Sequence, residues 1–190
     1  MKKTFAGLLA ALSVLISCSS NETTTIVTPN ARQLAWADAE VGVLIHFDMP
    51  DYNFRNWGTH PDASVFNPTE LNTDQWLETA HKLGAKYAVL VAKHCSGFSL
   101  WPTEAHDYSI KQSPWKNGEG DIVADFIASC KKYNIKPGIY ASTTANGYLY
   151  VDNPGVVQGG GPVSQEEYNK IVTQQLTELW SNYGELFEVW

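Results

Sequence analysis

The 190-residue sequence predicts an α/β fold built around a parallel β-sheet. Short continuous apolar runs, typical of strands that are buried on both faces of such a sheet, occur at residues 41–47, 87–92, 136–142 and 186–190. Segments with apolar residues at helical spacing lie between these runs. Because right-handed crossovers return each strand to the same sheet, this alternation favours a parallel sheet with helices outside it.

Each of the three predicted helices carries start or end signals. The helices cover residues 72–84, beginning at Asn72 or Thr73, then 121–132 and 164–184. Gly84 is a typical residue at a helix C-terminus. Lys131 and Lys132 place positive charge at the C-terminal end of the second helix. Ser164 and Glu167 have the spacing of a capping box and open the third.

Two closures of the sheet fit this pattern, namely an open doubly wound sheet and a (β/α)8 barrel. No Gly-x-Gly-x-x-Gly motif follows any of the strands, so the dinucleotide-binding form of the open sheet is not supported. The glycines at 159–161 precede a helix cap and are interpreted as a linker. In either closure, reactive groups are expected beyond the carboxyl ends of the strands.

The N-terminus predicts an export signal. Lys2 and Lys3 precede an apolar run at 5–16 that is too short for a permanent membrane span. The residues before Cys18 resemble a bacterial lipobox, which predicts a signal peptide over 1–17, a lipid on Cys18 and a flexible tether over 18–35. The expected location is the bacterial cell envelope, with the membrane as a partner through the lipid. An ordinary signal peptide with a chance cysteine is the alternative.

Composition excludes several classes of protein. The sequence has 44% hydrophobic residues and a net charge of −7, which rules out a disordered tail, a collagen and a small disulfide scaffold. No basic run beyond Lys2 and Lys3 is present, so nucleic acid is not an expected partner. The spacing of Cys95 and Cys130 indicates neither a disulfide framework nor a zinc site.

Polar and aromatic residues gather where the predicted strands end. The strand-end residues are His46, Asp48, Lys93, His94, Cys95, Tyr140, Ser142, Glu188 and Trp190. The two loops that follow the first two strands add the rings of Tyr52, Phe54, Trp57, His60, Phe98, Trp101 and His106. Flat apolar rings beside neutral polar groups suit a sugar. Core packing is the alternative for each Trp, and Phe98 with Trp101 could simply cover the top of the sheet.

A metal site is a weaker alternative at the same strand ends. His46 and Asp48 are two residues apart, and His94 could supply a third ligand. No second His-rich strand end accompanies them. A metal-dependent barrel hydrolase is therefore kept only as an alternative.

Several motifs, in order along the chain, are similar to those of the α-L-fucosidases of glycoside hydrolase family 29. These are Leu44-Ile45-His46-Phe47, the run from Lys93 to Trp101, Gly138-Ile139-Tyr140-Ala141-Ser142, and Val189-Trp190. The segments 66–71 and 113–118 also resemble the family. The resemblance runs from about residue 36 to 190, and implies a sugar hydrolase that needs no cofactor and no metal.

The resemblance implies that His46, His94 and Tyr140 contact fucose, and that Trp57 and Trp190 line its pocket. The expected substrate is a terminal α-L-fucoside of a glycan, hydrolysed by an exo-acting enzyme. The family mechanism is retaining: a carboxylate attacks the anomeric carbon while a second carboxylic acid protonates the leaving oxygen.

This chain departs from the family pattern at three positions. Cys95 replaces a histidine, Ser96 an acid and Asn56 a glutamate, which puts the linkage and aglycone preference in doubt. The resemblance places the nucleophilic Asp two residues beyond Trp190, where the sequence has ended, and the acid/base later still. Glu188 is interpreted as a supporting residue rather than a replacement nucleophile.

The expected fold class is therefore α/β, the N-terminal half of a (β/α)8 TIM-type barrel over 36–190, preceded by the signal peptide. A complete barrel takes about 250 residues, so a truncated and inactive glycosidase is expected, with its last strand as an exposed edge. A non-catalytic sugar-binding lipoprotein is the second hypothesis.

Overall fold

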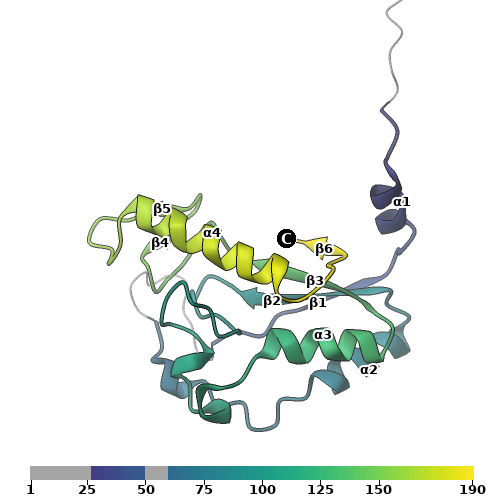
Figure 1. Ribbon diagram of the computed structural model, residues 1–190, viewed down its shortest axis with the longest axis horizontal. Coiled ribbons are helices and arrows are strands. Elements are labelled where there is room, and N and C mark those ends of the chain that lie inside the picture. Colours follow the sequence, from purple (N-terminus) through teal and green to yellow (C-terminus); the bar gives the residue numbers. More distant parts are fainter. Residues whose placement is uncertain (1–26, 50–59) are drawn as a thin grey trace, which may run out of the picture.

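The computed structural model describes residues 27–49 and 60–190 of the chain. Its main feature is a four-stranded parallel sheet with the strand order β1-β2-β3-β6 (Figure 1). The strands are β1 (Gly42–Ile45), β2 (Tyr87–Lys93), β3 (Lys136–Ala141) and β6 (Glu188–Val189). These strands follow one another in the chain as they do in the sheet, so the predicted α/β fold is confirmed.

Three helices connect the strands, and the predicted caps of α2 and the predicted start of α4 are confirmed, whereas α4 ends at Ser181 and not at the predicted Gly184. They are α2 (Thr73–Leu83), α3 (Ile122–Lys132) and α4 (Gln165–Ser181). The Asn72 side chain caps α2, and Gly84 ends it with a φ of 90°, a conformation that glycine adopts without steric cost. Ser164 and Glu167 form both hydrogen bonds of the capping box that opens α4.

The two faces of the sheet differ in cover. Side chains alternate between faces along a strand, and Leu90 of β2 points to the same side as Ile139 of β3. This side packs against Leu77 of α2, Phe126 of α3 and Leu179 of α4, all fully buried in one hydrophobic core. Helices α2 and α3 pack against each other, and Figure 1 shows α3 running alongside the strands. Helices α2, α3 and α4 thus cover one face of the sheet.

The prediction that the first strand is buried on both faces is wrong for β1. Leu44, on the side of the sheet away from the helices, is 53% exposed, and Val189 of β6 is 52% exposed. Both strands lie at the edges of the sheet. The inner strands β2 and β3 each have a partner on both sides, and β2 is buried along nearly its whole length. Burial of this kind requires neighbouring strands on both sides. The sequence of a strand does not show whether it lies inside the sheet or at its edge.

Helix α1 (Ala31–Ala37) corrects the predicted tether over 18–35 at its C-terminal end. Asn30 caps this helix and forms a capping box with Gln33 through bonds of 3.0 and 2.8 Å. Trp36 then donates from Nε1 to Oε2 of Glu188 at 2.9 Å. The helix is therefore tied to β6, which follows 152 positions later.

The connections contain smaller elements that the sequence did not predict. These are the 3-10 helices η1 (Ala63–Val65), η2 (Ile110–Gln112) and η3 (Trp115–Gly118), and an antiparallel hairpin of β4 (Val151–Asp152) and β5 (Val156–Val157). The glycines at 159–161 follow the hairpin in a loop, where a linker was expected. Among the described residues, no helix is both long and apolar enough to cross a membrane.

Candidate functional site

Four of the five predicted sugar-contacting residues form one row across the carboxyl ends of the strands. His46 follows β1, His94 follows β2, Tyr140 lies on β3 and Trp190 follows β6. The ring centroids are 4.4 Å apart from His46 to His94, 5.6 Å from His94 to Tyr140, and 5.9 Å from Tyr140 to Trp190. Parallel pairing places these strand ends together, so residues far apart in the sequence become neighbours. The fifth residue, Trp57, lies outside the described residues.

Strand pairing holds the row in place. The backbone N–H of Ala141 donates to the carbonyl of Trp190 at 3.0 Å, and the N–H of Trp190 donates to the carbonyl of Ile139 at 2.9 Å. His46 is exposed, while His94 and Tyr140 are half-buried. Trp190 is 64% exposed. The row is thus a firmly held, accessible wall of rings with polar atoms among them.

Asp48 lies beside the row and is fixed from two directions. Its Oδ1 accepts from the backbone N–H of Met49 at 2.8 Å and from the Ser96 hydroxyl at 2.5 Å. Burial raises the pKa of the Asp48 carboxyl, and the two hydrogen bonds offset that rise only in part. Asp48 was expected to be a loop acid, and its contact with Ser96 was not predicted. The sequence feature that indicated a place for Asp48 near the row was its i, i+2 spacing from His46.

The pKa shifts of His94 and Tyr140 in the row, and of Cys95 beside it, favour the neutral forms of these three groups. Burial lowers the pKa of His94, the charge that His46 can carry lowers it further, and Asp48 opposes them. Burial and the nearby Cys95 raise the pKa of the Tyr140 hydroxyl. Burial and Asp48 raise the pKa of the Cys95 thiol. Neutral groups of this kind donate and accept hydrogen bonds, as sugar hydroxyls require.

A family model described as alpha-L-fucosidase matches residues 36–190. The chain belongs to the α-L-fucosidase family. Alpha-L-fucosidase 1 of Arabidopsis thaliana is 38% identical over 163 residues, which are 85% of this chain and 30% of that protein. The chain therefore spans about a third of the length of this curated fucosidase.

Solved structures agree with this membership. A candidate α-L-fucosidase of Bacteroides thetaiotaomicron is 40% identical, with a TM-score of 0.78 over 85% of this chain and 40% of its own. A glycoside hydrolase 29 family member from an unknown rumen bacterium is 35% identical, with a TM-score of 0.71 over 85% of this chain and 27% of its own. The resemblance to family 29 is thus confirmed, and the fucosidase fold extends beyond the part that this chain contains.

Lys93 opens the fucosidase-like run of residues but does not join the row of rings. Its side chain is buried and donates from Nζ to Oε1 of Gln175 on α4 at 2.7 Å. Gln175 in turn donates to the Ser99 hydroxyl and contacts Nε2 of His106. Burial lowers the pKa of Lys93 to about 7. Lys93 therefore links β2 to α4, a role that its place at a strand end did not indicate.

The loop aromatics of this fucosidase-family chain divide between core and rim. Phe98 and Trp101 are buried, which agrees with the packing alternative. His60 lies 4.8 Å from Tyr108 and 4.9 Å from Tyr148, measured between ring centroids. Neither tyrosine was predicted from the sequence, since each lies in a loop without periodicity.

The loop after β3 closes over the loop after β2. The N–H groups of Gly147 and Tyr148 donate to the carbonyls of Cys95 and Ser96. Gly97 lies at the closest approach, with a φ of 86°, against the amide of the fully buried Asn146. The backbone of this fucosidase-like motif is thus held from above by a second loop.

Replacing Gly97 with alanine should lower the free energy of unfolding by about 1.5 kcal/mol, because the new Cβ would overlap the Asn146 amide in a strained conformation. Asn146 cannot move aside, since its Oδ1 accepts from the N–H of Leu149 at 2.9 Å. Urea unfolding checks this. Gly159→Ala is the matched control, because nothing lies within 4 Å of its new Cβ. Equal stability of the two variants would contradict the prediction.

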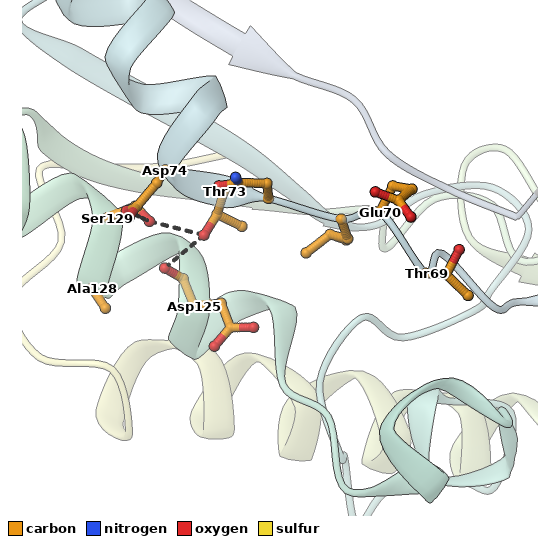
Figure 2. Close-up of a pocket in the computed structure, with 9 residues that line it drawn as sticks. Thr69, Glu70, Thr73, Asp74, Asp125, Ala128 and Ser129 are labelled. Atoms are coloured by element: carbon orange, nitrogen blue, oxygen red, sulfur yellow. Dashed lines mark hydrogen bonds between the residues drawn. The ribbon is translucent and has the colours of Figure 1, made fainter.

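A separate hollow of about 460 Å³ lies between the start of α2 and the middle of α3 (Figure 2). The Ser129 hydroxyl donates to Oδ1 of Asp74 at 2.7 Å and lies 2.8 Å from the Thr73 hydroxyl. Lys132 pairs with the other oxygen of Asp74 at 2.5 Å. The hydrogen bonds and the ion pair among these side chains join two helices of the fucosidase-like fold.

Proposed function

We propose that this chain supplies the fucose-binding wall of a retaining, exo-acting α-L-fucosidase that hydrolyses terminal α-L-fucosides of glycans. The row of His46, His94, Tyr140 and Trp190 carries the proposal. Imidazole and phenol groups can hydrogen bond to sugar hydroxyls, and the faces of Tyr140 and Trp190 can cover C–H surface. The perpendicular arrangement of these two rings, at 81°, offers an apolar corner to the methyl group that distinguishes fucose.

The chemistry of hydrolysis would need two carboxylates flanking the glycosidic bond. The family resemblance places both beyond Trp190, in the part of the relatives that this chain does not span. The residues in hand would therefore bind and orient the sugar, and the neutral forms of His94 and Tyr140 suit that task. Glu188 bonds to Trp36, which supports a structural role for this carboxylate rather than nucleophilic attack.

Fucose binding tests the proposal. Isothermal titration calorimetry of the chain with methyl α-L-fucoside should detect binding, and His94→Ala should weaken it about tenfold, since one hydrogen bond to the half-buried imidazole is worth about 1.4 kcal/mol. His81→Ala is the control, because His81 lies on α2. Binding that is absent, or equal in both variants, would contradict the proposal. Hydrolysis is then assayed on a chain extended to the length of the relatives.

We further propose that the four strands belong to a (β/α)8 barrel. The parallel order, the helices on one face and the exposed edges β1 and β6 support this arrangement. In a closed barrel the face of the sheet opposite α2, α3 and α4, which carries His46 and Tyr140, would line the interior. The low exposure of Val89 and Val91 on that face suits such a setting.

A lipid anchor is proposed for the N-terminus. The signal over 1–17 and Cys18 lie outside the described residues, and the motif alone supports this proposal. The anchor would place the enzyme at the cell envelope, where extracellular glycans arrive. Cell fractionation checks it: the Cys18→Ser variant should leave the membrane fraction in which the unmodified sequence is found.

A further inference from the structure

We propose that His46, Asp48 and His94 form a binding site for a divalent transition-metal ion such as Zn²⁺. Within the described ranges 27–49 and 60–190, one ligand atom from each of these residues lies within 4.8 Å of the other two. The site is built from the ends of two adjacent strands, β1 and β2, which pair in register. Zn²⁺ would therefore cross-link the two strand ends.

The geometry needs only a small adjustment. A tetrahedral zinc site with bonds of about 2.1 Å has ligand atoms about 3.4 Å apart. The rings of His46 and His94 are already 4.4 Å apart between centroids, with an angle of 52° between their planes. His46 is exposed, so its ring can rotate towards the ion without disturbing the core. The half-buried His94 and Asp48 supply the more fixed side of the site.

Asp48 carries the support that a metal-binding carboxylate needs. Its two hydrogen bonds, from the Met49 N–H and the Ser96 hydroxyl, both reach Oδ1. The Ser96 hydroxyl itself accepts from the N–H of Phe98 at 3.1 Å, which fixes its orientation. Among the described residues, no hydrogen bond reaches Oδ2, so this oxygen can face an ion. Such outer hydrogen bonds orient metal ligands and tune their affinity.

The ligand set indicates which ions fit. Two imidazoles and one carboxylate suit Zn²⁺, Cu²⁺ or Ni²⁺, whereas Ca²⁺ and Mg²⁺ prefer oxygen ligands throughout. Three protein ligands leave a fourth tetrahedral position for water. The site therefore discriminates between transition metals and the hard cations that dominate in abundance.

Metal and sugar would compete for the same imidazoles. His46 and His94 belong to the row to which fucose binding is assigned, so this part of the inference rests on the proposed function. An ion held by both rings would occupy their nitrogen lone pairs and remove them from the sugar. Zn²⁺ would therefore act as an inhibitor rather than a cofactor.

Calorimetric titration of the tag-free chain with Zn²⁺ tests the site. We expect one Zn²⁺ per chain, no binding of Mg²⁺, and affinity at least about tenfold weaker in Asp48→Asn and in His94→Ala. Ser96→Ala, which touches no metal, should weaken binding about tenfold by freeing Asp48. His81→Ala should bind as the unmodified chain does. Equal Zn²⁺ affinity in Asp48→Asn and the unmodified chain, or no binding at all, would overturn the site.

Two further arms separate the possible failures. Cys95→Ser should keep Zn²⁺ binding, and a loss there would overturn the ligand set in favour of a thiolate. Saturating methyl α-L-fucoside should lower the apparent Zn²⁺ affinity, and an unchanged affinity would refute the competition. A chain that binds Zn²⁺ but no fucoside keeps the metal site and removes the proposed function.

Discussion

Replacing Glu178 with alanine should lower the free energy of unfolding by about 3 kcal/mol, the largest effect that we expect from a single side chain outside the core. Glu178 lies on α4 and accepts four hydrogen bonds. The donors are Trp101 Nε1 at 2.8 Å, the Thr103 hydroxyl at 2.6 Å, the Glu104 N–H at 3.0 Å and Gln174 Nε2 at 3.2 Å. Trp101 and Thr103 are almost fully buried, so their donors would lose their partner away from water.

Two variants separate this bonding from other effects of α4. Glu178→Gln keeps one acceptor oxygen and should cost about half as much as alanine. Glu166→Ala, on the same helix, removes a 79% exposed carboxylate paired with Lys170 and should cost less than about 0.5 kcal/mol. Urea unfolding followed by circular dichroism measures all three. Equal loss in Glu166→Ala and Glu178→Ala would show that the bonds to Trp101 and Thr103 contribute nothing.

The pH dependence of the Glu178 contribution has a definite sign. Burial acts to raise the pKa of Glu178, but its four hydrogen bonds together outweigh burial and hold the pKa below its ordinary value. A lowered folded pKa means that the stabilisation is complete above the unfolded value and is lost as the pH falls through the folded value. The stability difference between Glu178→Gln and the unmodified chain should therefore shrink in acid.

Lys93 should make the chain more stable as the pH rises from 7 to 9, by about 2 kcal/mol. Burial lowers its pKa from 10.5 to about 7 in the folded chain. Over this range the unfolded lysine still binds its proton while the folded one has largely released it, so stability rises with pH. His106 beside it does not contribute, because burial and Lys93 lower its pKa to about 3 and it is neutral in both states.

Lys93→Met isolates this effect. The variant keeps the length of the side chain and removes the charge, so the difference in unfolding free energy between the two chains should change by about 2 kcal/mol from pH 7 to 9. Subtraction cancels the tyrosines and cysteines, which both chains share. Parallel pH profiles would show that Lys93 titrates normally. Lys86→Met, a change on the exposed surface, should leave the profile unaltered.

The features of this structure that could be predicted are those that depend on local sequence patterns. Gly84 and Ser164 end and begin helices where the sequence indicates, and the strand-end rule alone brings His46, His94 and Tyr140 to one edge. Exposure was not predictable in the same way. Leu44 is apolar yet half-exposed, because cover depends on which neighbours are present.

Contacts between side chains that lie far apart in the chain could not be predicted from the sequence either. Asp48 pairs with Ser96, and Lys93 with Gln175, across 48 and 82 positions. Neither pairing follows a short-range spacing rule, since each depends on how two loops or a strand and a helix meet. The same holds for α1. Its cap at Asn30 follows a local sequence pattern, whereas the hydrogen bond that joins it to Glu188 does not.

The alternation of side chains along β3 gives the row of rings one more property. Tyr140 faces away from the helices and its neighbours Ile139 and Ala141 face them, so a slip of one residue would bury the phenol and expose the core. The four strand ends must all be in register before the wall exists. We therefore expect a ligand at this edge to bind the correctly paired chain and to stabilise it relative to chains in which a strand has slipped.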